Sequence, residues 1–471
     1  MRTITTHYIN GMFVESHGRQ VMDIISPSTE KVIAQVTLGD EEDARRGIAA
    51  AKQTFASYGR STKKDRVEIL HDLHRAIAAR VDDLTNAMVE EYGGVVQFAR
   101  PIIQAGANVF LEAAKALQEL ELTRKLGKTS ITLEPIGVAG LISPWNANGL
   151  FLCMKLSSAV AAGCTAVMKP SELSALQTRV WLECIHEAKL PKGLCNVVIG
   201  LGNVVGAELV RNPDVAKISF TGSATVGKSI MRDGAATMKR VTLELGGKSP
   251  NIILDDADLR KAIPDAFVIG FMNSGQACVA GTRLLVPKSR FQEIKRALTE
   301  TIHTFPVGNP ADPKTAIGPM VSKKQYERVQ SYIRKGIEEG AEVLVGGEGH
   351  PVGFETGYFV KPTVFINVKN DMTIAREEIF GPVLSVITYE DEEDAIRIAN
   401  DSDYGLHGYV SGEDIQRARR VASQIQAGRV AINGALDDQQ APFGGFKHSG
   451  VGREFGTYGI EAFLEPRAVL E

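Results

Sequence analysis

Short apolar runs that alternate with helical segments constrain the fold of this 471-residue chain more than any other feature. Five runs of strand length cover residues 138–142, 166–168, 197–199, 218–220 and 241–245, and helical patterns separate them. Parallel strands need long crossover connections, usually helices, so this alternation is typical of a doubly wound parallel sheet. The sequence therefore predicts an α/β domain built on such a sheet.

A second alternating series follows Asp255 and predicts a second α/β domain. Its expected helices pass through Phe271 and start at Phe291, and its expected strands lie near 284–286, 343–345, 360–365, 383–389 and 430–433. The first third is helical by pattern, with apolar stripes over 44–55 and 67–88 and a helix expected to start at Pro101. Alternation over 129–133 indicates a strand or hairpin arm.

Composition narrows the class of protein. Lys and Arg number 53 against 56 Asp and Glu, without a long block of one sign, so nucleic-acid and membrane binding are not expected. No apolar segment approaches the ~20 residues that span a bilayer, and the N-terminus lacks a signal-peptide core. We therefore expect a cytoplasmic protein of two or three domains.

The cysteines and histidines indicate neither a disulfide framework nor a metal site. Five cysteines without a Cys-x-x-Cys pair fit a reducing compartment, and most are expected to be inert core residues. The nine histidines form no His-Glu-x-x-His motif, so we predict that the protein has no catalytic metal.

Polar motifs follow the predicted strands of the first domain, at 143–146, 169–172, 200–206 and 221–227. Ligands of doubly wound sheets bind outside the carboxyl ends of the strands, so these motifs predict a nucleotide site. Gly222 and Ser223 open a helix whose first amides favour an anion, although Ser223 as a plain helix cap fits equally. The glycines from Gly200 to Gly206 are spaced one residue wider than a dinucleotide fingerprint, so a tight turn explains them about as well.

Lys169 and Glu172 follow another strand, where they could hold the hydroxyls of an adenosine ribose. A carboxylate there favours NAD over NADP, because it repels a 2′-phosphate. A helix start with Glu172 in its first turn is an equal alternative.

Cys278, Glu244 and Asn146 are the candidate catalytic residues. A thiolate attacks carbonyl carbon, a nearby carboxylate can deprotonate the thiol or a water, and an asparagine amide can donate to an oxyanion. A single cysteine is more often a small core hydrophobe, and an asparagine after a strand is more often a loop residue.

Taken in order, these segments resemble the NAD(P)-dependent aldehyde dehydrogenase superfamily over nearly the whole chain. The matching motifs are those at 8–11, 244–248, 275–283, 377–383 and 442–447, together with the strand-end motifs. The resemblance implies that Cys278 forms a thiohemiacetal and then a thioester, with Asn146 and the Cys278 backbone N–H as the oxyanion hole. Glu244 is then the base that activates water for hydrolysis.

The resemblance also implies the cofactor contacts, the domain limits and the assembly. The implied adenosine and pyrophosphate contacts are Trp145, Lys169, Glu172, Gly202, Phe220, Gly222, Ser223 and Val226. Leu245, Glu378 and Phe380 lie near the nicotinamide half, with Glu378 on its ribose. Residues 1–116 and 137–246 would form a Rossmann-like NAD-binding domain, 247–454 the catalytic domain, and 117–136 with 455–471 a β-arm. That arm would join two or four copies into a homodimer or homotetramer.

Two segments depart from the family pattern. Many members have Phe-Pro after the Trp-Asn pair, whereas this chain has Ala147 and Asn148, so the pocket is expected to widen and Asn148 to cap a helix. Asp437 and Asp438 lie in a loop at the substrate entrance and could attract a polar or cationic aldehyde, although a solvated loop is the more common case.

Three alternatives to this function stay open. A CoA-acylating semialdehyde dehydrogenase is disfavoured because such members typically lack the base at Glu244. A thiol hydrolase would not need the cofactor motifs, and a binding protein would not need Cys278, Glu244 and Asn146 together. The sequence does not identify the aldehyde, and NADP stays possible because Lys169 could bind a 2′-phosphate.

Overall fold

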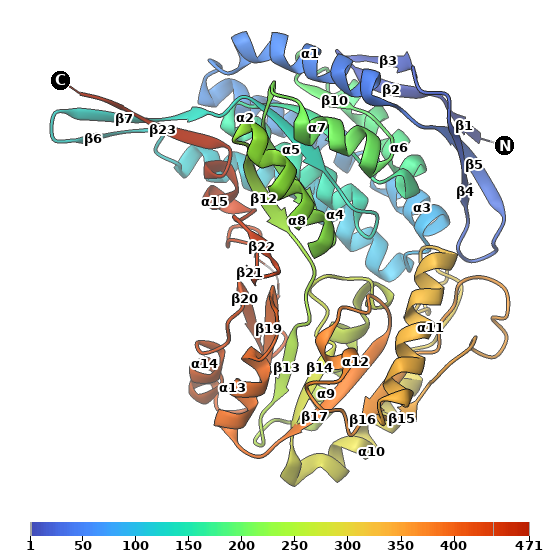
Figure 1. Cartoon of the computed structure of the whole chain (residues 1–471). Coiled ribbons are helices and arrows are strands. Elements are labelled where there is room, and N and C mark those ends of the chain that lie inside the picture. Colours follow the sequence, from blue (N-terminus) through green and yellow to red (C-terminus); the bar gives the residue numbers. More distant parts are fainter. Residues whose placement is uncertain (1, 437, 471) are drawn as a thin grey trace.

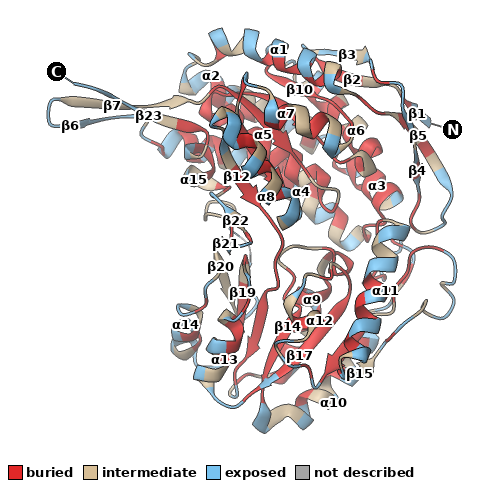
Figure 2. Cartoon of the chain, in the orientation of Figure 1, coloured by how far each residue is buried: buried red, intermediate tan, exposed pale blue. Residues whose placement is uncertain are grey.

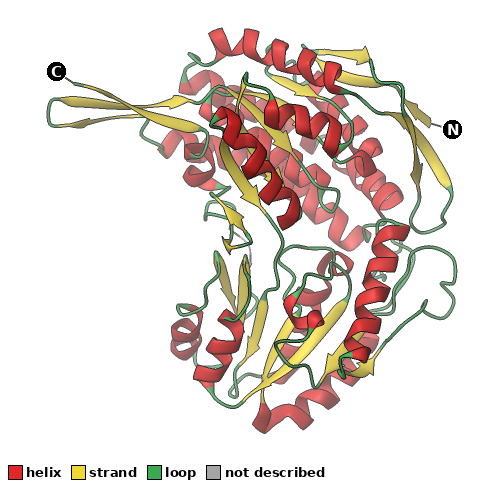
Figure 3. Ribbon diagram, viewed as in Figure 1, coloured by secondary structure: helices red, strands yellow, loops and turns green. Residues whose placement is uncertain are grey.

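The computed structural model describes residues 2–436 and 438–470. Two large sheets flanked by helices lie one above the other in Figure 1, and a thin three-stranded arm projects from the side of the upper one. Figure 3 shows the same layers by element type, with helices against both sheets. The predicted α/β fold with two mainly parallel sheets is confirmed.

Five parallel strands form the centre of an eight-stranded sheet. They are β8 (Val138–Ile142), β9 (Thr165–Lys169), β10 (Cys195–Val197), β11 (Val215–Thr221) and β12 (Arg240–Glu244). Their spatial order is β12-β11-β8-β9-β10. The strand order therefore runs outward from β8 in one direction and from β11 in the other. The topological switch point lies between these two neighbouring strands, at their carboxyl ends.

Helices cover both faces of this sheet, so its central strands are buried. The contacts between elements place three helices on one face, α1 (Glu41–Tyr58), α7 (Ala207–Arg211) and α8 (Ala224–Gly234). On the other face lie α2 (Lys63–Ala78), α3 (Val81–Tyr92), α4 (Val96–Glu119), α5 (Asn148–Ala162) and α6 (Ala175–Glu187). All residues of β8 and β9 are buried, as expected for parallel strands covered on both sides (Figure 2).

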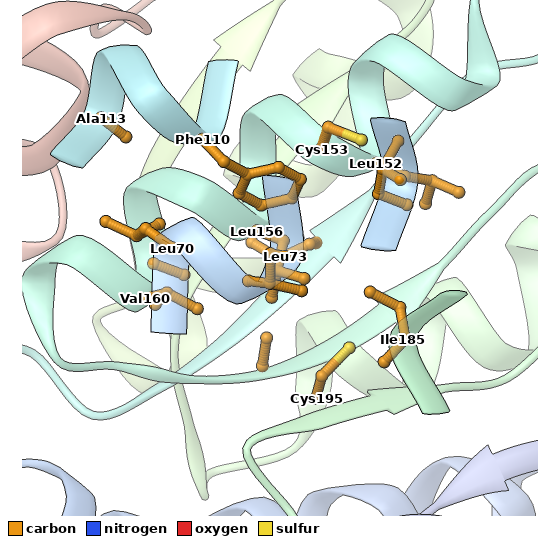
Figure 4. Packing of buried hydrophobic residues seen from close by; sticks show 14 of the residues in the cluster. Leu70, Leu73, Phe110, Ala113, Leu152, Cys153, Leu156, Val160, Ile185 and Cys195 are labelled. Atoms are coloured by element: carbon orange, nitrogen blue, oxygen red, sulfur yellow. The ribbon is translucent and has the colours of Figure 1, made fainter. Parts of the chain in front are cut away.

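Side chains from α2, α4 and α5 fill the space between the helices and the sheet. Figure 4 shows Leu70 and Leu73 of α2 beside Phe110 of α4 and Leu156 of α5. All four are fully buried in one apolar cluster. Cys153, Cys164, Cys184 and Cys195 are buried and free, as expected for inert core cysteines.

Three details of the first third differ from the expectation. The stripe over 67–88 is two helices, α2 and α3, because an apolar period can continue across the break at Arg80. The helix expected at Pro101 begins at Val96, since Ala99 already packs in the core ahead of the proline. Short N-terminal strands precede the helices, namely β1 (Arg2–Ile4), β2 (Thr6–Ile9), β3 (Met12–Glu15), β4 (Val21–Ile25) and β5 (Val32–Thr37). β2 and β3 extend the large sheet next to β10.

The second sheet has seven strands and confirms the second α/β series. In spatial order they are β15 (Glu342–Val345), β16 (Thr363–Ile366), β17 (Val383–Tyr389), β14 (Arg283–Pro287), β13 (Pro250–Ile253), β19 (His407–Ser411) and β20 (Arg429–Ile432). Only β15 pairs antiparallel. The helices of this half are α9 (Leu259–Phe271), α10 (Phe291–Thr301), α11 (Lys323–Glu338), α12 (Thr373–Arg376), α13 (Glu392–Asn400) and α14 (Ile415–Ala422).

The C-terminal segment returns to the first sheet and to the arm. β22 (Gly450–Val451) pairs with β12, and α15 (Gly456–Glu461) contacts α4 and α5. The arm consists of β6 (Thr123–Leu126), β7 (Thr129–Pro135) and β23 (Leu464–Val469), all antiparallel. Short strands β18 (Tyr404–Gly405) and β21 (Phe446–Lys447) pair with each other. In the described part of the chain, no helix combines the length and apolar character needed to cross a membrane.

Candidate active site

A strained loop between α9 and β14 carries Cys278. Asn273, Ser274 and Gly275 have positive φ angles of 53°, 58° and 74°. A Cβ on Gly275 would lie 2.2 Å from the carbonyl carbon of Gly381, so only glycine allows this close approach. The loop is further held by Ser274, whose Oγ accepts a hydrogen bond from the Gly318 N–H at 2.9 Å.

Asn146 lies after β8, and the Cys278 loop fixes its orientation. Its Nδ2 donates to the backbone carbonyl of Gln276 at 2.9 Å. Its own backbone carbonyl accepts from Asn273 Nδ2 at 2.7 Å. One of the two amide hydrogens of Asn146 is therefore committed to the loop.

Cys278 and Asn146 both line one cavity of about 610 Å³. Apolar side chains supply most of its wall, namely Phe98, Ile102, Leu150, Phe151, Met154, Val268, Ile269, Met272, Phe443 and Phe455. Volumes of this order are typical of small-molecule sites.

Glu244 ends β12 as a buried carboxylate. It is 1% exposed, and among the described residues neither of its carboxylate oxygens has a hydrogen-bond partner. Burial raises the pKa of Glu244 well above its usual range, and the nearby carboxylate of Glu454 adds to the effect. Glu454 in turn accepts from Lys155 Nζ at 2.8 Å, which places a buried ion pair behind Glu244.

The Cys278 thiol is half-buried and electrostatically disfavoured as a thiolate. Burial, followed by the carboxylates of Glu378 and Glu244, raises its pKa to about 12. At neutral pH this arrangement holds a neutral thiol, so attack on a carbonyl requires that a base takes its proton.

The segment after Glu244 links the thiol to Glu378. A Cβ on Gly247 would lie 2.4 Å from the backbone oxygen of Cys278, so these two backbones are in close contact. The Gly247 N–H donates to Glu378 Oε1 at 3.0 Å. Burial raises the pKa of Glu378 to about 7, and this hydrogen bond partly offsets the rise.

Trp145 and Phe380 extend this side of the site. Their rings meet edge to face with centroids 5.3 Å apart, and the ring of Tyr92 also packs against Trp145 with centroids 5.7 Å apart. Leu245 is buried against α8, where a Cβ on Gly227 would come within 2.7 Å of it.

The remaining predicted residues lie at the carboxyl ends of β9, β10 and β11. Lys169 Nζ donates to Glu172 Oε2 at 2.9 Å. Ser223 caps α8 by accepting from the Val226 N–H at 3.4 Å. Phe220 packs beneath Gly222, where a Cβ would lie 2.5 Å from its ring.

This edge fits a dinucleotide. A Cβ on Gly202 would meet no atom within 4 Å, so open space faces this glycine. The three-turn helix α8 presents its N-terminus at the same edge, where the dipole and free amides favour a pyrophosphate. Within residues 2–436 and 438–470, no three His, Cys, Asp or Glu side chains are grouped to hold a metal ion.

Several residues of the site were not found from the sequence. Asn273 lies inside the recognised Cys278 motif, and its side-chain amide could have been noticed there as one of the donors of that loop. Lys155 and Glu454 meet across 299 positions, and no local pattern indicates that pairing.

The two segments that depart from the family pattern both border the cavity. Asn148 does not cap α5 and is its first residue, since its side chain bonds Ser143 at 3.3 Å and Thr178 at 3.2 Å. Those two hydroxyls compete successfully with the helix amides for the side chain. Asp437 lies outside the described residues, and Asp438 lies at the cavity rim, where its carboxylate accepts from the Gln440 N–H.

Known proteins resemble this chain over its full length. A profile described as the aldehyde dehydrogenase family matches residues 13–469. A 3-succinoylsemialdehyde-pyridine dehydrogenase from a Pseudomonas species is 45% identical over 100% of this chain and 99% of its own length. A putative aldehyde dehydrogenase from Staphylococcus haemolyticus is 44% identical with the same coverage.

Solved structures agree with the sequence relatives. A mutant of aldehyde dehydrogenase C from Pseudomonas syringae, in complex with NAD⁺ and octanal, superimposes with a TM-score of 0.97 at 41% identity, covering 99% of this chain and 96% of that one. Betaine aldehyde dehydrogenase from Staphylococcus aureus, in complex with NAD⁺, gives a TM-score of 0.95 at 36% identity, covering 99% and 94%.

Proposed function

The chain belongs to the aldehyde dehydrogenase family, and we propose that it oxidises an aldehyde to a carboxylate with NAD as coenzyme, using Cys278, Asn146 and Glu244 as catalytic residues. The observation that carries the residue assignment is the cavity that Cys278 and Asn146 share. The backbone contact between Gly247 and Cys278 ties the Glu244 strand end to the same place.

Cys278 begins the reaction by adding its sulfur to the aldehyde carbon. The thiol proton passes to Glu244 and on to solvent, while the new C–S bond places negative charge on the former carbonyl oxygen and gives the thiohemiacetal as an oxyanion. The second amide hydrogen of Asn146 and the backbone N–H of Cys278 stabilise this oxygen. One such donor is worth about 3–4 kcal/mol in a transition state.

NAD, when bound, supplies the acceptor for the hydrogen and the electron pair that leave the thiohemiacetal carbon. Loss of that hydrogen leaves a thioester on Cys278. Glu244 then takes a proton from water, whose oxygen attacks the thioester carbon. The C–S bond breaks, and the carboxylate and the thiol are released.

The strand ends supply residues that would hold NAD. Lys169 and Glu172 are suited to the adenosine ribose, and the N-terminus of α8 to the pyrophosphate. The proposed remaining contacts are Trp145, Gly202, Phe220, Gly222, Ser223, Val226 and Leu245, with Glu378 and Phe380 on the nicotinamide side. The NAD⁺ complexes of related structures support this assignment. NADP remains an alternative coenzyme, because Lys169 could pair with a 2′-phosphate.

We also propose the division into a NAD-binding domain (1–116 and 137–246), a catalytic domain (247–454) and an arm (117–136 and 455–471), assembled as a homodimer or homotetramer. Every residue of β6 is exposed, including Leu126 at 70%, and exposed edge strands pair readily with another copy. A cytoplasmic location stays a prediction. Native mass spectrometry would test the assembly, and a monomer would contradict it.

Near-ultraviolet absorbance of reduced coenzyme tests the activity. Purified protein, NAD or NADP, and a panel of aldehydes should give reduction without added CoA, and Cys278→Ala should abolish it. Reduction that requires CoA would favour the acylating alternative. Aryl ester cleavage by Cys278 in protein that neither binds NAD nor reduces it would favour the hydrolase.

A further inference from the structure

Residues 143–148, between β8 and α5, carry two side chains with proposed roles, Trp145 and Asn146. The start of this segment is fixed to the sheet, because the Ser143 N–H donates to the backbone carbonyl of Lys169 at 3.1 Å. Its end is Asn148, the first residue of α5. Whatever holds the two ends therefore also sets the position of the two side chains between them.

The side chain of Asn148 closes this segment. Its Oδ1 accepts from Ser143 Oγ at 3.3 Å, which joins the two ends. Its Nδ2 donates to Thr178 Oγ1 at 3.2 Å, which ties the closed segment to α6. Asn148 and Thr178 are 0% exposed and Ser143 is 4% exposed. Water does not replace hydrogen bonds in such a place, so removing Asn148 leaves two buried hydroxyls without this partner.

The backbone at this position suits asparagine better than the proline that is common in the family. Ala147 has φ −155° and ψ 50°. A residue before proline is pushed to ψ of about +120 to +160°, so a proline at position 148 would strain Ala147. Asparagine leaves this backbone unconstrained and holds the segment by its side chain instead. The departure from the family pattern therefore coincides with a different means of fixing the segment.

Asn146 is the residue for which a small displacement matters most. The Cys278 loop holds it through Gln276, whose carbonyl accepts from Asn146 Nδ2, and through Asn273, which donates to its backbone carbonyl. The network of Asn148 fixes the same segment from the side of α6. A reacting group misplaced by about 1 Å can cost about 100-fold in rate, so both anchors bear on the oxyanion contact.

We propose that Asn148 is a positioning residue for the oxyanion hole, which holds Asn146 in place by closing residues 143–148 and tying them to α6. This inference rests on the aldehyde oxidation proposed above. Asn148→Ala should lower kcat about 10- to 100-fold, as measured by the absorbance of reduced coenzyme at saturating NAD. The KM for the aldehyde should stay within about threefold, because the uniform binding of the substrate is unaffected.

Other variants separate the side-chain bonds from a role in starting α5. Proline is favoured at the first position of a helix, so Asn148→Pro should keep the unmodified kcat if Asn148 only begins the helix. We expect instead a loss at least as large as in Asn148→Ala. Asn148→Asp keeps an acceptor for both hydroxyls and should lose less. An Asn148→Pro protein with the unmodified kcat would overturn the proposal.

Thr178→Val removes one of the two bonds at nearly constant size. One neutral hydrogen bond is worth about fivefold, so kcat should fall by about that factor. Circular dichroism and the Tm show which variants are folded. Should Asn148→Ala not fold, Thr178→Val decides the question, and an unchanged kcat in it would overturn the proposal.

A double-mutant cycle distinguishes positioning from general damage. If Asn148 acts through Asn146, adding Asn148→Ala to Asn146→Ala should change kcat by less than about twofold, whereas independent effects multiply. A further loss equal to that of the single Asn148→Ala variant would contradict the proposal. Asn108→Ala is the matched control, since this exposed asparagine of α4 also has a side-chain hydrogen bond, from Gln104 at 3.2 Å. It should leave kcat unchanged.

The two levels of the argument fail separately. If the unmodified protein reduces NAD with no aldehyde in a Cys278-dependent way, the proposed function fails. If the unmodified protein is active and folded Asn148→Ala has the same kcat, only the positioning role of Asn148 fails.

Discussion

Gly246→Ala would displace Glu378 without changing the backbone. The new Cβ would lie 2.5 Å from Glu378 Oε2 and 2.8 Å from its Cδ, whereas real Cβ atoms essentially never approach within 3.0 Å. Gly246 has no positive φ, so alanine is tolerated there. The carboxylate is the end of a flexible side chain, so it moves away and the fold is retained.

The displaced carboxylate should lose the hydrogen bond that we propose it makes to the nicotinamide ribose. Hydrogen bonds to charged groups are worth about 1.5–3 kcal/mol, which corresponds to NAD binding weakened by about 10- to 150-fold. The bond from the Gly247 N–H would be lost too, and since that bond lowers the pKa of Glu378, its pKa should rise above about 7. The defect should therefore be larger near pH 8 than at pH 6, because at pH 6 the carboxyl group is largely protonated in both proteins.

Isothermal titration of NAD into the folded variant measures this effect. Gly234→Ala is a matched control, because its Cβ would come no closer than 3.5 Å to another atom. We expect the control to bind NAD as the unmodified protein does. A Kd for Gly246→Ala within twofold of the unmodified value, at both pH values, would refute the placement of Glu378 at the coenzyme.

Three further predictions test the catalytic and coenzyme residues. Asn146→Ala should lower kcat by about 10²- to 10³-fold with little change in NAD binding, and a loss below tenfold would argue against its oxyanion role. The pKa of Cys278 is raised to about 12 and that of Glu244 is raised above its usual range, and both groups act after losing a proton. The kcat/KM should thus climb between about pH 6 and pH 9, whereas an acidic optimum in the pH profile would contradict this assignment. Glu172→Gln removes the carboxylate beside Lys169 and should raise the kcat/KM for NADP relative to NAD at least tenfold, as measured by steady-state kinetics; an unchanged ratio would show that Glu172 does not face the ribose.

Periodicity predicted most of the parallel strands and long helices correctly, because burial on both faces leaves uninterrupted apolar runs. It predicted β17 to the residue and α10 from its first residue. It missed the N-terminal strands, which are short and half-exposed, and it merged α2 with α3. It placed the start of α4 wrongly at Pro101, because in sequence a proline inside the first turns of a helix resembles a proline at the first helical position.

The order of motifs along the sequence, through the family resemblance that it carries, was enough to indicate the reaction class. A thiol in a glycine-containing loop, a carboxylate before two glycines and an amide after a strand are local features, so Cys278, Glu244 and Asn146 could be proposed as catalytic residues once the resemblance was recognised. Strand-end glycines and the Lys169–Glu172 pair likewise indicated a nucleotide, because doubly wound sheets bring the ends of their strands to one edge.

Only the tertiary structure decided the environment of these groups. Glu244 is buried without a hydrogen-bond partner among the residues that the structure describes. The ion pair of Lys155 with Glu454 and the position of Arg429 over two phenylalanine rings join residues that are far apart in the chain. Solvent exclusion and long-range contacts arise only when the chain is packed, and they set the pKa values, the shape of the cavity and its charge. The sequence determined which chemical groups are present, and the fold determined what each of them faces.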